Sequence, residues 1–186
     1  LAKRQMKEAQ AGVHDFGTGG GNWRRITTDA RGSITNIMFC GGLGAGLTDE
    51  DVRDLGRLPP KLTNLNIQLA PPIAIKFSEL PRGLKGLGRL SASYPRGMRM
   101  LNAADQGLDT LPRSLEELWL DAVGLTHLDT NNLPRGLEWA GFIGNQIAEV
   151  DLSGVPSSLK YLNLERNAVE DVDLLTIPED ARQVNI

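Results

Sequence analysis

A repeat of 22 residues runs through the second half of the chain and constrains its fold more than any other feature. Prolines that follow a leucine, valine or isoleucine recur at this spacing, at Pro112, Pro134, Pro156 and Pro178. The full unit reads P-x-x-L-x-x-L-x-L-x-x-N-x-L, with conservative changes among the copies. One unit is too short to bury its own apolar face, so neighbouring units must stack around a shared core. The repeat therefore predicts a solenoid.

The spacing of the leucines predicts a strand in every unit. In L-x-x-L-x-L the last two leucines are two residues apart, so they face one side of an extended strand while their neighbours face the other. This register predicts eight strands, which start at Ile34, Leu62, Leu84, Met98, Leu115, Leu137, Leu159 and Ala181. Their apolar residues would form the core column of the solenoid.

Some copies depart from the common length. Only 14 and 17 residues separate the prolines at 81, 95 and 112, so we expect an irregular convex side that is nearly free of helix. By contrast, 28 residues separate Ile34 from Leu62, which is enough for a return helix. Thr48 followed by three acidic residues is typical of an N-cap and first helical turn, so we predict a helix at about 48–57.

The unit L-x-x-L-x-L-x-x-N-x-L resembles that of leucine-rich repeat proteins, and the L-P-x-x-L start is similar to their short bacterial and protist versions. The resemblance covers about residues 23–186. It implies an α/β leucine-rich repeat solenoid: a curved parallel β-sheet of about eight coils, with a mostly irregular convex side and one short helix. It also implies that the asparagine after each strand bonds backbone groups in the following turn.

The segment NWRRITTDARGSITNI resembles the N-terminal cap of plant and protist-surface members, W-x-x-V-T-C-D-x-x-G-x-V-T-x-L. Thr28 stands where such caps often carry a disulfide cysteine, and Cys40 is the only cysteine of the chain, so an intramolecular disulfide is excluded. Residues 23–57 are accordingly predicted to form the cap and first long repeat, and residues 58–186 the short repeats. Together they make one leucine-rich repeat domain over 23–186.

Residues 1–22 are predicted to be an N-terminal tail or short helix followed by a glycine-rich connector. The first turns carry Lys3, Arg4 and Lys7, which indicate either a solvated tail or a basic arm that docks on a partner or a lipid surface. The connector FGTGGGN lacks the G-K-[ST] ending of a phosphate-binding loop. We therefore interpret it as a flexible link.

Composition narrows the class of protein without naming a partner. The chain has 186 residues, of which 40% are hydrophobic and 23% charged, with a formal net charge of −3. This balance gives no general attraction to nucleic acid, and no apolar run is long enough for a transmembrane segment. A single cysteine and the lack of N-glycosylation sequons favour an intracellular location, cytoplasm or organelle, and leave the compartment unknown. The chain has no initial methionine and stops inside the last predicted strand, which suggests a fragment or an end capped by another subunit.

Residues that could carry catalysis are few and far apart. His14 and His127 belong to distant segments, and Cys40 has no histidine near it in the register. Asp151, Asp171 and Asp173 recur in the return segments, where aspartate is typical of turns, and a calcium site is the weaker alternative. We therefore expect no enzyme activity, no catalytic residue, no metal and no cofactor.

Two columns of residues are predicted to point outward on the concave face of the sheet, because the third and fifth positions of each strand alternate with the core residues. The third-position column comprises Asn36, Asn64, Gly86, Met100, Glu117, Trp139, Tyr161 and Gln183. The fifth-position column comprises Met38, Asn66, Gly88, Asn102, Trp119, Gly141, Asn163 and Asn185. Large side chains gather at Met100, Trp119, Trp139 and Tyr161, and Gly141 leaves room that a partner or a neighbouring ring could fill.

Exposed aromatic side chains are typical of the centres of protein interfaces, so this part of the concave face is the predicted binding site. A mostly acidic rim would suit a partner with basic residues around an apolar centre. The predicted partner-binding surface comprises Met100, Glu117, Trp119, Asp121, Trp139, Tyr161, Asn163, Glu165 and Arg166. For one member an alternative stays open: Ala140 stands where leucine is expected, so a shifted strand would turn Trp139 into the core.

The sequence thus favours a non-catalytic protein–protein interaction module or scaffold that binds a protein partner through its concave face, as a subunit of a larger assembly. The alternative is the recognition domain of a longer signalling or catalytic protein. A third, weaker hypothesis is nucleic-acid or carbohydrate recognition by the asparagines Asn64, Asn66, Asn102 and Asn163. The scarcity of lysine and arginine on the concave face counts against nucleic acid.

Overall fold

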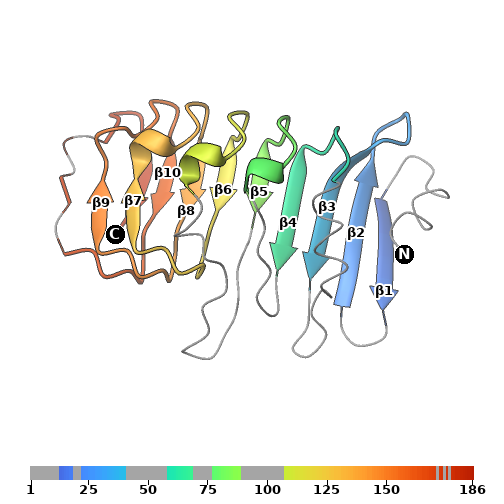
Figure 1. The fold of residues 1–186 in the computed structure, drawn as a ribbon, viewed down its shortest axis with the longest axis horizontal. Coiled ribbons are helices and arrows are strands. Elements are labelled where there is room, and N and C mark those ends of the chain that lie inside the picture. Colours follow the sequence, from blue (N-terminus) through green and yellow to red (C-terminus); the bar gives the residue numbers. More distant parts are fainter. Residues whose placement is uncertain are drawn as a thin grey trace.

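The structure is a computed structural model, which describes residues 13–18, 22–40, 58–68, 77–88, 107–170, 172–173, 175 and 177–186. A large sheet dominates the described residues (Figure 1). Its nine strands, in spatial order, are β1 (Val13–Thr18), β2 (Asn22–Thr28), β3 (Ile34–Cys40), β4 (Asn64–Gln68), β5 (Gly86–Gly88), β6 (Glu117–Trp119), β8 (Trp139–Gly141), β10 (Tyr161–Asn163) and β11 (Gln183–Asn185). The strands from β3 to β11 run parallel, while β1 and β2 are antiparallel additions at the N-terminal edge. The prediction of a solenoid with a parallel sheet is confirmed.

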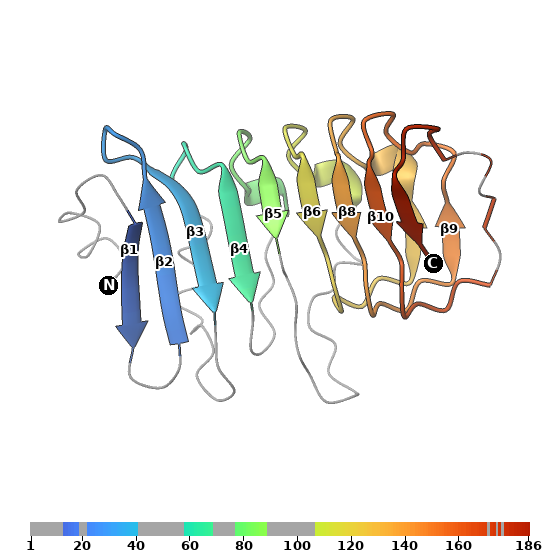
Figure 2. The same ribbon diagram turned by 180° about the vertical axis from the view of Figure 1, so that it is seen from behind.

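Helix is almost absent from the described residues. They contain three short 3₁₀ helices, η3 (Phe77–Glu79), η5 (Leu108–Thr110) and η6 (Thr130–Asn132). The 3₁₀ helices and a small second sheet lie behind the large sheet when the molecule is viewed as in Figure 2, and no described helix or strand covers the opposite face, which we call the open face. This open face is the one predicted to be concave. The helix predicted at 48–57 lies outside the described residues.

A tight turn opens each described coil and depends on the repeated proline. The proline carbonyl accepts a hydrogen bond from the amide three residues later, as in Pro134 to Leu137 at 3.1 Å and Pro156 to Leu159 at 2.9 Å. The next strand starts there with its leucines pointing to the core. The P-x-x-L spacing is therefore the length of a four-residue turn that feeds directly into a strand.

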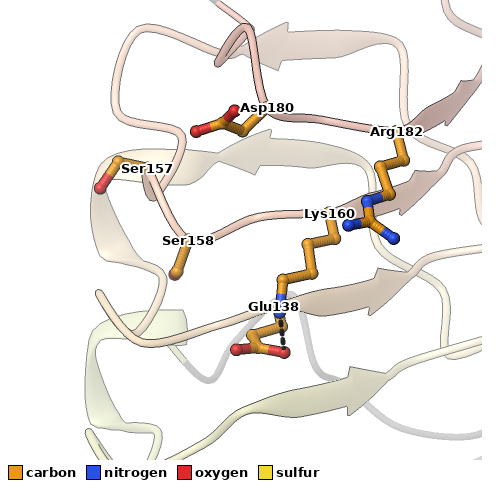
Figure 3. A pocket seen from close by; sticks show the side chains of 6 residues that line it. All are labelled: Glu138, Ser157, Ser158, Lys160, Asp180 and Arg182. Atoms are coloured by element: carbon orange, nitrogen blue, oxygen red, sulfur yellow. Dashed lines mark hydrogen bonds and ion pairs between the residues drawn. The ribbon is translucent and has the colours of Figure 1, made fainter.

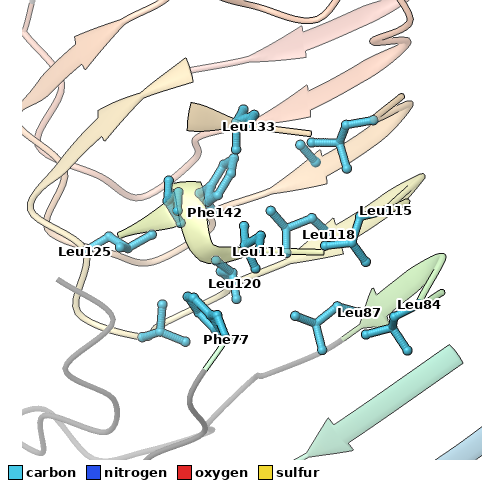
Figure 4. Close-up of a cluster of buried hydrophobic side chains, with 14 of the residues drawn as sticks. Phe77, Leu84, Leu87, Leu111, Leu115, Leu118, Leu120, Leu125, Leu133 and Phe142 are labelled. Carbon is cyan, nitrogen blue, oxygen red and sulfur yellow. The ribbon is translucent and has the colours of Figure 1, made fainter. Parts of the chain in front are cut away.

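The core lies between the large sheet and the return segments. Leucines at the first, fourth and sixth positions of the unit are fully or almost fully buried, as in Leu115, Leu118 and Leu120. Figure 4 shows that side chains from the returns, including Phe77, Leu111 and Leu133, meet these leucines. Each coil therefore completes the core of its neighbours, as stacked repeats must.

One predicted strand is wrong. The unit that starts at Met98 was expected between those that start at Leu84 and Leu115, but β5 pairs directly with β6, with Gly86 opposite Glu117. The physical reason is chain length, because repeats with this leucine spacing take about 20–29 residues to form a strand and its return. Segments of 14 and 17 residues are too short for two coils. Seven parallel strands therefore follow one another among the described residues, not eight.

The sheet also extends into the stretch 1–22 that we expected to be a tail and connector. β1 pairs with β2 along its whole length, from Val13 opposite Thr27 to Thr18 opposite Asn22. Part of the predicted glycine-rich connector thus belongs to two paired strands. Residues 1–12, including the basic residues of the predicted arm, lie outside the described part of the chain.

Asparagines link successive coils as the sequence predicted. Asn145 is 6% exposed, and its amide nitrogen donates to the carbonyls of Leu120 and Phe142, both at 2.8 Å. Its oxygen accepts the amides of Val123 at 2.9 Å and Leu125 at 3.2 Å. Asn167 repeats the arrangement one coil later, with its nitrogen 2.9 Å from the carbonyl oxygen of Phe142. Beyond the ends of the strands, where the backbone hydrogen bonds of the sheet stop, these side chains bond the backbone instead.

The return segments carry a second, two-stranded parallel sheet formed by β7 (His127–Asp129) and β9 (Glu149–Asp151). Each V-D-L segment ends in a turn in which the aspartate accepts a backbone amide two residues on. Asp151 accepts from Ser153 at 2.8 Å, and Asp173 accepts from Leu175 at 3.0 Å. The prediction of turn-forming aspartates is confirmed at these two positions, and Asp171 lies outside the described residues.

Candidate functional site

The two outward columns follow the predicted register wherever the structure describes them. In the third-position column Glu117 lies opposite Trp139, and Trp139 lies opposite Tyr161. In the fifth-position column Trp119 lies opposite Gly141, which in turn lies opposite Asn163. The predicted members Met100 and Asn102 lie outside the described residues, and the direct pairing of β5 with β6 leaves no place between these strands for their coil.

Trp139 points outward from the sheet. Its side chain is 40% exposed, whereas the adjacent Ala140 is fully buried. The alternative in which Trp139 turns into the core is therefore wrong. Phe142, also fully buried, brings a large side chain into the same core two residues after the small Ala140. The volume that a leucine at 140 would supply is thus provided without a shift of the strand.

Three rings from three successive coils gather on the open face and form what we call the aromatic cluster: Trp119, Trp139 and Tyr161. Tyr161 is the central ring. Its centroid lies 6.0 Å from that of Trp139 at an interplanar angle of 30°, and 5.7 Å from that of Trp119 at 46°. Aromatic pairs in offset or tilted arrangements at these distances attract one another beyond the burial of their area. The cluster is therefore a stable feature of the free protein.

Glycine gives Trp119 its place on the sheet. A Cβ atom at Gly141 would lie 2.8 Å from Cζ3 of Trp119, which is too close for any side chain. On the other side, a Cβ atom at Gly88 would lie 3.8 Å from Cδ1 of the same indole. Trp119 thus lies across its neighbouring strands, and the space predicted at Gly141 is filled by a ring of this chain.

Two residues of the predicted binding surface serve the scaffold. Asn163 is 3% exposed; its nitrogen donates to the Tyr161 hydroxyl at 2.9 Å and its oxygen accepts the Glu165 amide at 2.8 Å. Asp121 accepts the Ile143 amide at 2.9 Å. Asn163 therefore positions the central ring, and Asp121 holds the turn of the neighbouring coil. Sequence position alone cannot separate these roles from direct contact with a partner.

The exposed rim of the cluster consists of Glu117, Glu165 and Arg166. Glu117 lies on β6, at the first strand of the cluster, while Glu165 and Arg166 follow β10. Arg166 has a φ of 59°, in the left-handed region that favours glycine. The rim retains the predicted acidic excess.

A row of charged side chains just before the strands was missed by the sequence reasoning, which considered only outward columns within the strands. The second position of the unit reads Lys85, Glu116, Glu138, Lys160 and Arg182 in successive coils. Two ion pairs follow, Lys85 with Glu116 and Lys160 with Glu138, both at 2.7 Å. A comparison of the second position of successive units in the sequence would have shown these opposite charges in adjacent coils.

This charged edge borders the aromatic cluster. The pKa of Glu138 lies below its ordinary value, mainly because the carboxylate accepts a hydrogen bond from Lys160, and it also accepts one from the side chain of Trp139. A shallow, open depression of about 320 Å³ lies here (Figure 3). It is lined by Glu138, Ser157, Ser158, Lys160, Asp180 and Arg182. Trp139 thus stacks on Tyr161 and follows Glu138 of the charged edge directly in the chain.

The aromatic cluster offers a surface for contact with a partner. Among the described residues, few side chains with catalytic chemistry lie near one another. His127 lies in β7 of the small sheet and only its neighbour Thr126 stands within hydrogen-bonding distance, at 3.4 Å. His14 and Cys40 belong to β1 and β3, and their side chains lie outside the described part. No group of three or more His, Cys, Asp or Glu side chains among the described residues is arranged to hold a metal ion.

None of the helices in the described part is long and apolar enough to span a membrane. Comparison of the chain with protein-family models, with curated proteins and with solved structures gives no match.

Proposed function

We propose that this chain is a leucine-rich repeat solenoid that acts as a non-catalytic interaction module and binds a protein partner through the aromatic cluster on its open face. One observation carries the proposal: two tryptophans and a tyrosine from successive coils gather on the uncovered side of the sheet, with Trp139 40% exposed. Folding alone gives no reason to expose such rings. Aromatic residues of this kind dominate the energetics of protein interfaces.

Membership of the leucine-rich repeat class rests on three features of the coils. They are the 22-residue spacing, the P-x-x-L turn that starts each strand, and the asparagines that bond the backbone of two coils. The coils would form a binding module either as a subunit of a larger assembly or as the recognition domain of a longer protein. The same open face serves both arrangements.

The hydrogen bonds that the asparagines already make within the chain favour a protein partner over a sugar. Asn163 is bonded through both ends of its amide, and Asn64 donates to Asn36 at 2.9 Å and to Thr63 at 3.1 Å. Amides that are already paired within the chain are poor donors and acceptors for a carbohydrate. The lysines nearest the cluster are likewise paired with glutamates, which weighs against a phosphate backbone.

Affinity capture with matched variants tests the proposal. Trp139→Ala removes the most exposed ring without touching the core, so folding should stay within about 1 kcal/mol of the wild type while capture of the partner falls at least about tenfold. Glu149→Ala, an exposed change on β9 of the small sheet, is the control and should capture as the wild type does. Proteins recovered equally by the wild type and by Trp139→Ala would overturn the assignment of the aromatic cluster.

A further inference from the structure

Glu117 and Trp139 form a pair across β6 and β8 on the open face. They stand directly opposite in the register of two parallel strands, which lie about 5 Å apart. Both side chains are exposed. A carboxylate and an indole therefore lie side by side at the edge of the aromatic cluster, facing solvent.

The two sides of the Trp139 indole differ in their surroundings. Tyr161 stacks on the β10 side, at 6.0 Å and 30°. On the opposite side the neighbouring strand presents Glu117. The face of the Trp139 indole that does not stack on Tyr161 therefore lies on the side of the Glu117 carboxylate.

Glu117 differs from Glu116 and Glu138 in having no cation among the described residues. Glu116 and Glu138 each pair with a lysine at 2.7 Å. The Glu117 side chain makes no ion pair or hydrogen bond with any other described residue. No described cation therefore compensates the charge beside Trp139, while the carboxylates of Glu116 and Glu138 are each paired with a lysine.

We propose that this pair is a subsite for an arginine side chain carried by an extended segment of the protein partner. The guanidinium would lie over the free face of Trp139 and bond the Glu117 carboxylate. This inference rests on the proposed function and specifies the chemistry of the partner. The recognised group is a cation, and the rim of Glu117, Glu165 and Arg166 keeps an excess of negative charge around it.

Arginine suits the geometry better than lysine does. The guanidinium is planar and weakly hydrated, so it stacks on an indole face and still directs N–H groups sideways into a carboxylate. A lysine ammonium is compact and strongly hydrated, and it loses more solvation when it lies on a ring.

A pair of short peptides provides the probe. One carries a single arginine between glycine and serine residues, and the other carries citrulline, which has the same planar shape without the charge. Titration into the full chain is followed by NMR at the indole N–H signals, which detects weak binding. We expect the arginine peptide to shift the Trp139 signal saturably and to bind about tenfold more tightly than the citrulline peptide.

Two glutamine variants locate the charge that matters. Glu117→Gln should weaken the arginine peptide about fivefold and leave the citrulline peptide unchanged, because only the ion pair is lost. Glu116→Gln removes the same charge one residue away, where it is already paired with Lys85, and should leave both peptides unchanged. Equal effects of the two variants, or equal binding of the two peptides, would overturn the arginine subsite.

The same variants separate this inference from the proposed function. Partner capture that is lost in Trp139→Ala but unaffected in Glu117→Gln would leave the interaction module standing and remove the arginine subsite. Capture that survives Trp139→Ala, together with saturable arginine binding, would mean that the subsite exists but does not hold the partner.

Discussion

At the scale of single residues, one backbone position recurs with a left-handed conformation. The eighth residue of three successive coils has positive φ: 55° at Ala122, 69° at Gly144 and 59° at Arg166. Glycine adopts this region without a steric penalty, while other residues pay about 1–2 kcal/mol. Only one of these three coils therefore carries the residue that the turn prefers. The strain at Ala122 and Arg166 is a property of the repeated turn rather than of either side chain.

Exchanging glycine and alanine at this position should change stability with opposite signs in adjacent coils. We expect Ala122→Gly to raise the free energy of unfolding by about 0.5–1 kcal/mol and Gly144→Ala to lower it by about 1 kcal/mol. A Cβ atom at Gly144 would meet only the Cβ of Ala122, at 4.0 Å, so the backbone alone determines the sign. Urea unfolding followed by tryptophan fluorescence measures both. A neutral Gly144→Ala would contradict the turn argument.

At the scale of elements, the turn between β2 and β3 depends on one aspartate. The Asp29 carboxylate accepts the amides of Arg31 at 2.9 Å and Ser33 at 2.8 Å, and Gly32 supplies the positive φ of 73°. These bonds satisfy backbone groups that the antiparallel pairing leaves open. The segment that resembles an N-terminal cap includes this turn. The structure shows the hydrogen bonds of Asp29 that stabilise it.

The charge of Asp29 should make this hairpin sensitive to acid. Its pKa is lowered, mainly by the backbone hydrogen bond from Ser33. A depressed pKa in the folded state means that the stabilisation is complete above the ordinary aspartate pKa and is lost as pH falls through the lower folded value. In Asp29→Asn, the decline of stability over that acidic range should be smaller than in the wild type, as measured by urea unfolding at successive pH values.

Glu149→Gln is the matched control for that measurement, because Glu149 is exposed on β9 and accepts no hydrogen bond from another described side chain. It should follow the acid profile of the wild type. Identical profiles for Asp29→Asn and the wild type would show that the carboxylate contributes nothing to the turn through its charge.

At the scale of the whole molecule, the stability of each coil depends on its contacts with the neighbouring coils. Each coil contacts its neighbours through the sheet, the leucine core and the asparagine bonds, as expected of a solenoid. Asn145 makes four hydrogen bonds from a buried site, three of them to the preceding coil. Loss of that side chain would leave the amides of Val123 and Leu125 and the carbonyl of Leu120 short of partners, while the Phe142 carbonyl keeps its bond from Asn167.

Asn145→Ala should therefore lower the free energy of unfolding by at least about 3 kcal/mol, since each buried group without a partner costs about 1–3 kcal/mol. Hydrogen exchange at the amides of Val123 and Leu125 should accelerate. Asn132→Ala, which removes one bond to Asp129 at 3.0 Å within the same turn of η6, is the control and should cost about 1 kcal/mol or less. Equal losses in the two variants would refute the bridging role.

The features that repeat locally could be predicted from the amino-acid sequence alone. The P-x-x-L turn, the alternation of core and outward residues, the asparagine bonds and the turn aspartates all depend on a few neighbouring residues, so their spacing predicts them. The outward directions of Trp119, Trp139 and Tyr161 followed from the same alternation. Most of the candidate site was therefore visible as a pattern with a period of 22.

The features that depend on contacts between coils became visible in the three-dimensional fold. Closing a coil requires a minimum length of chain, which is why β5 pairs with β6 and the unit at Met98 adds no strand between them. The glycine at 141 accommodates Trp119 from the preceding coil, and Asn163 is occupied by Tyr161 and Glu165. These outcomes depend on which side chain of one coil reaches into the space of another, and that choice is made by packing in three dimensions.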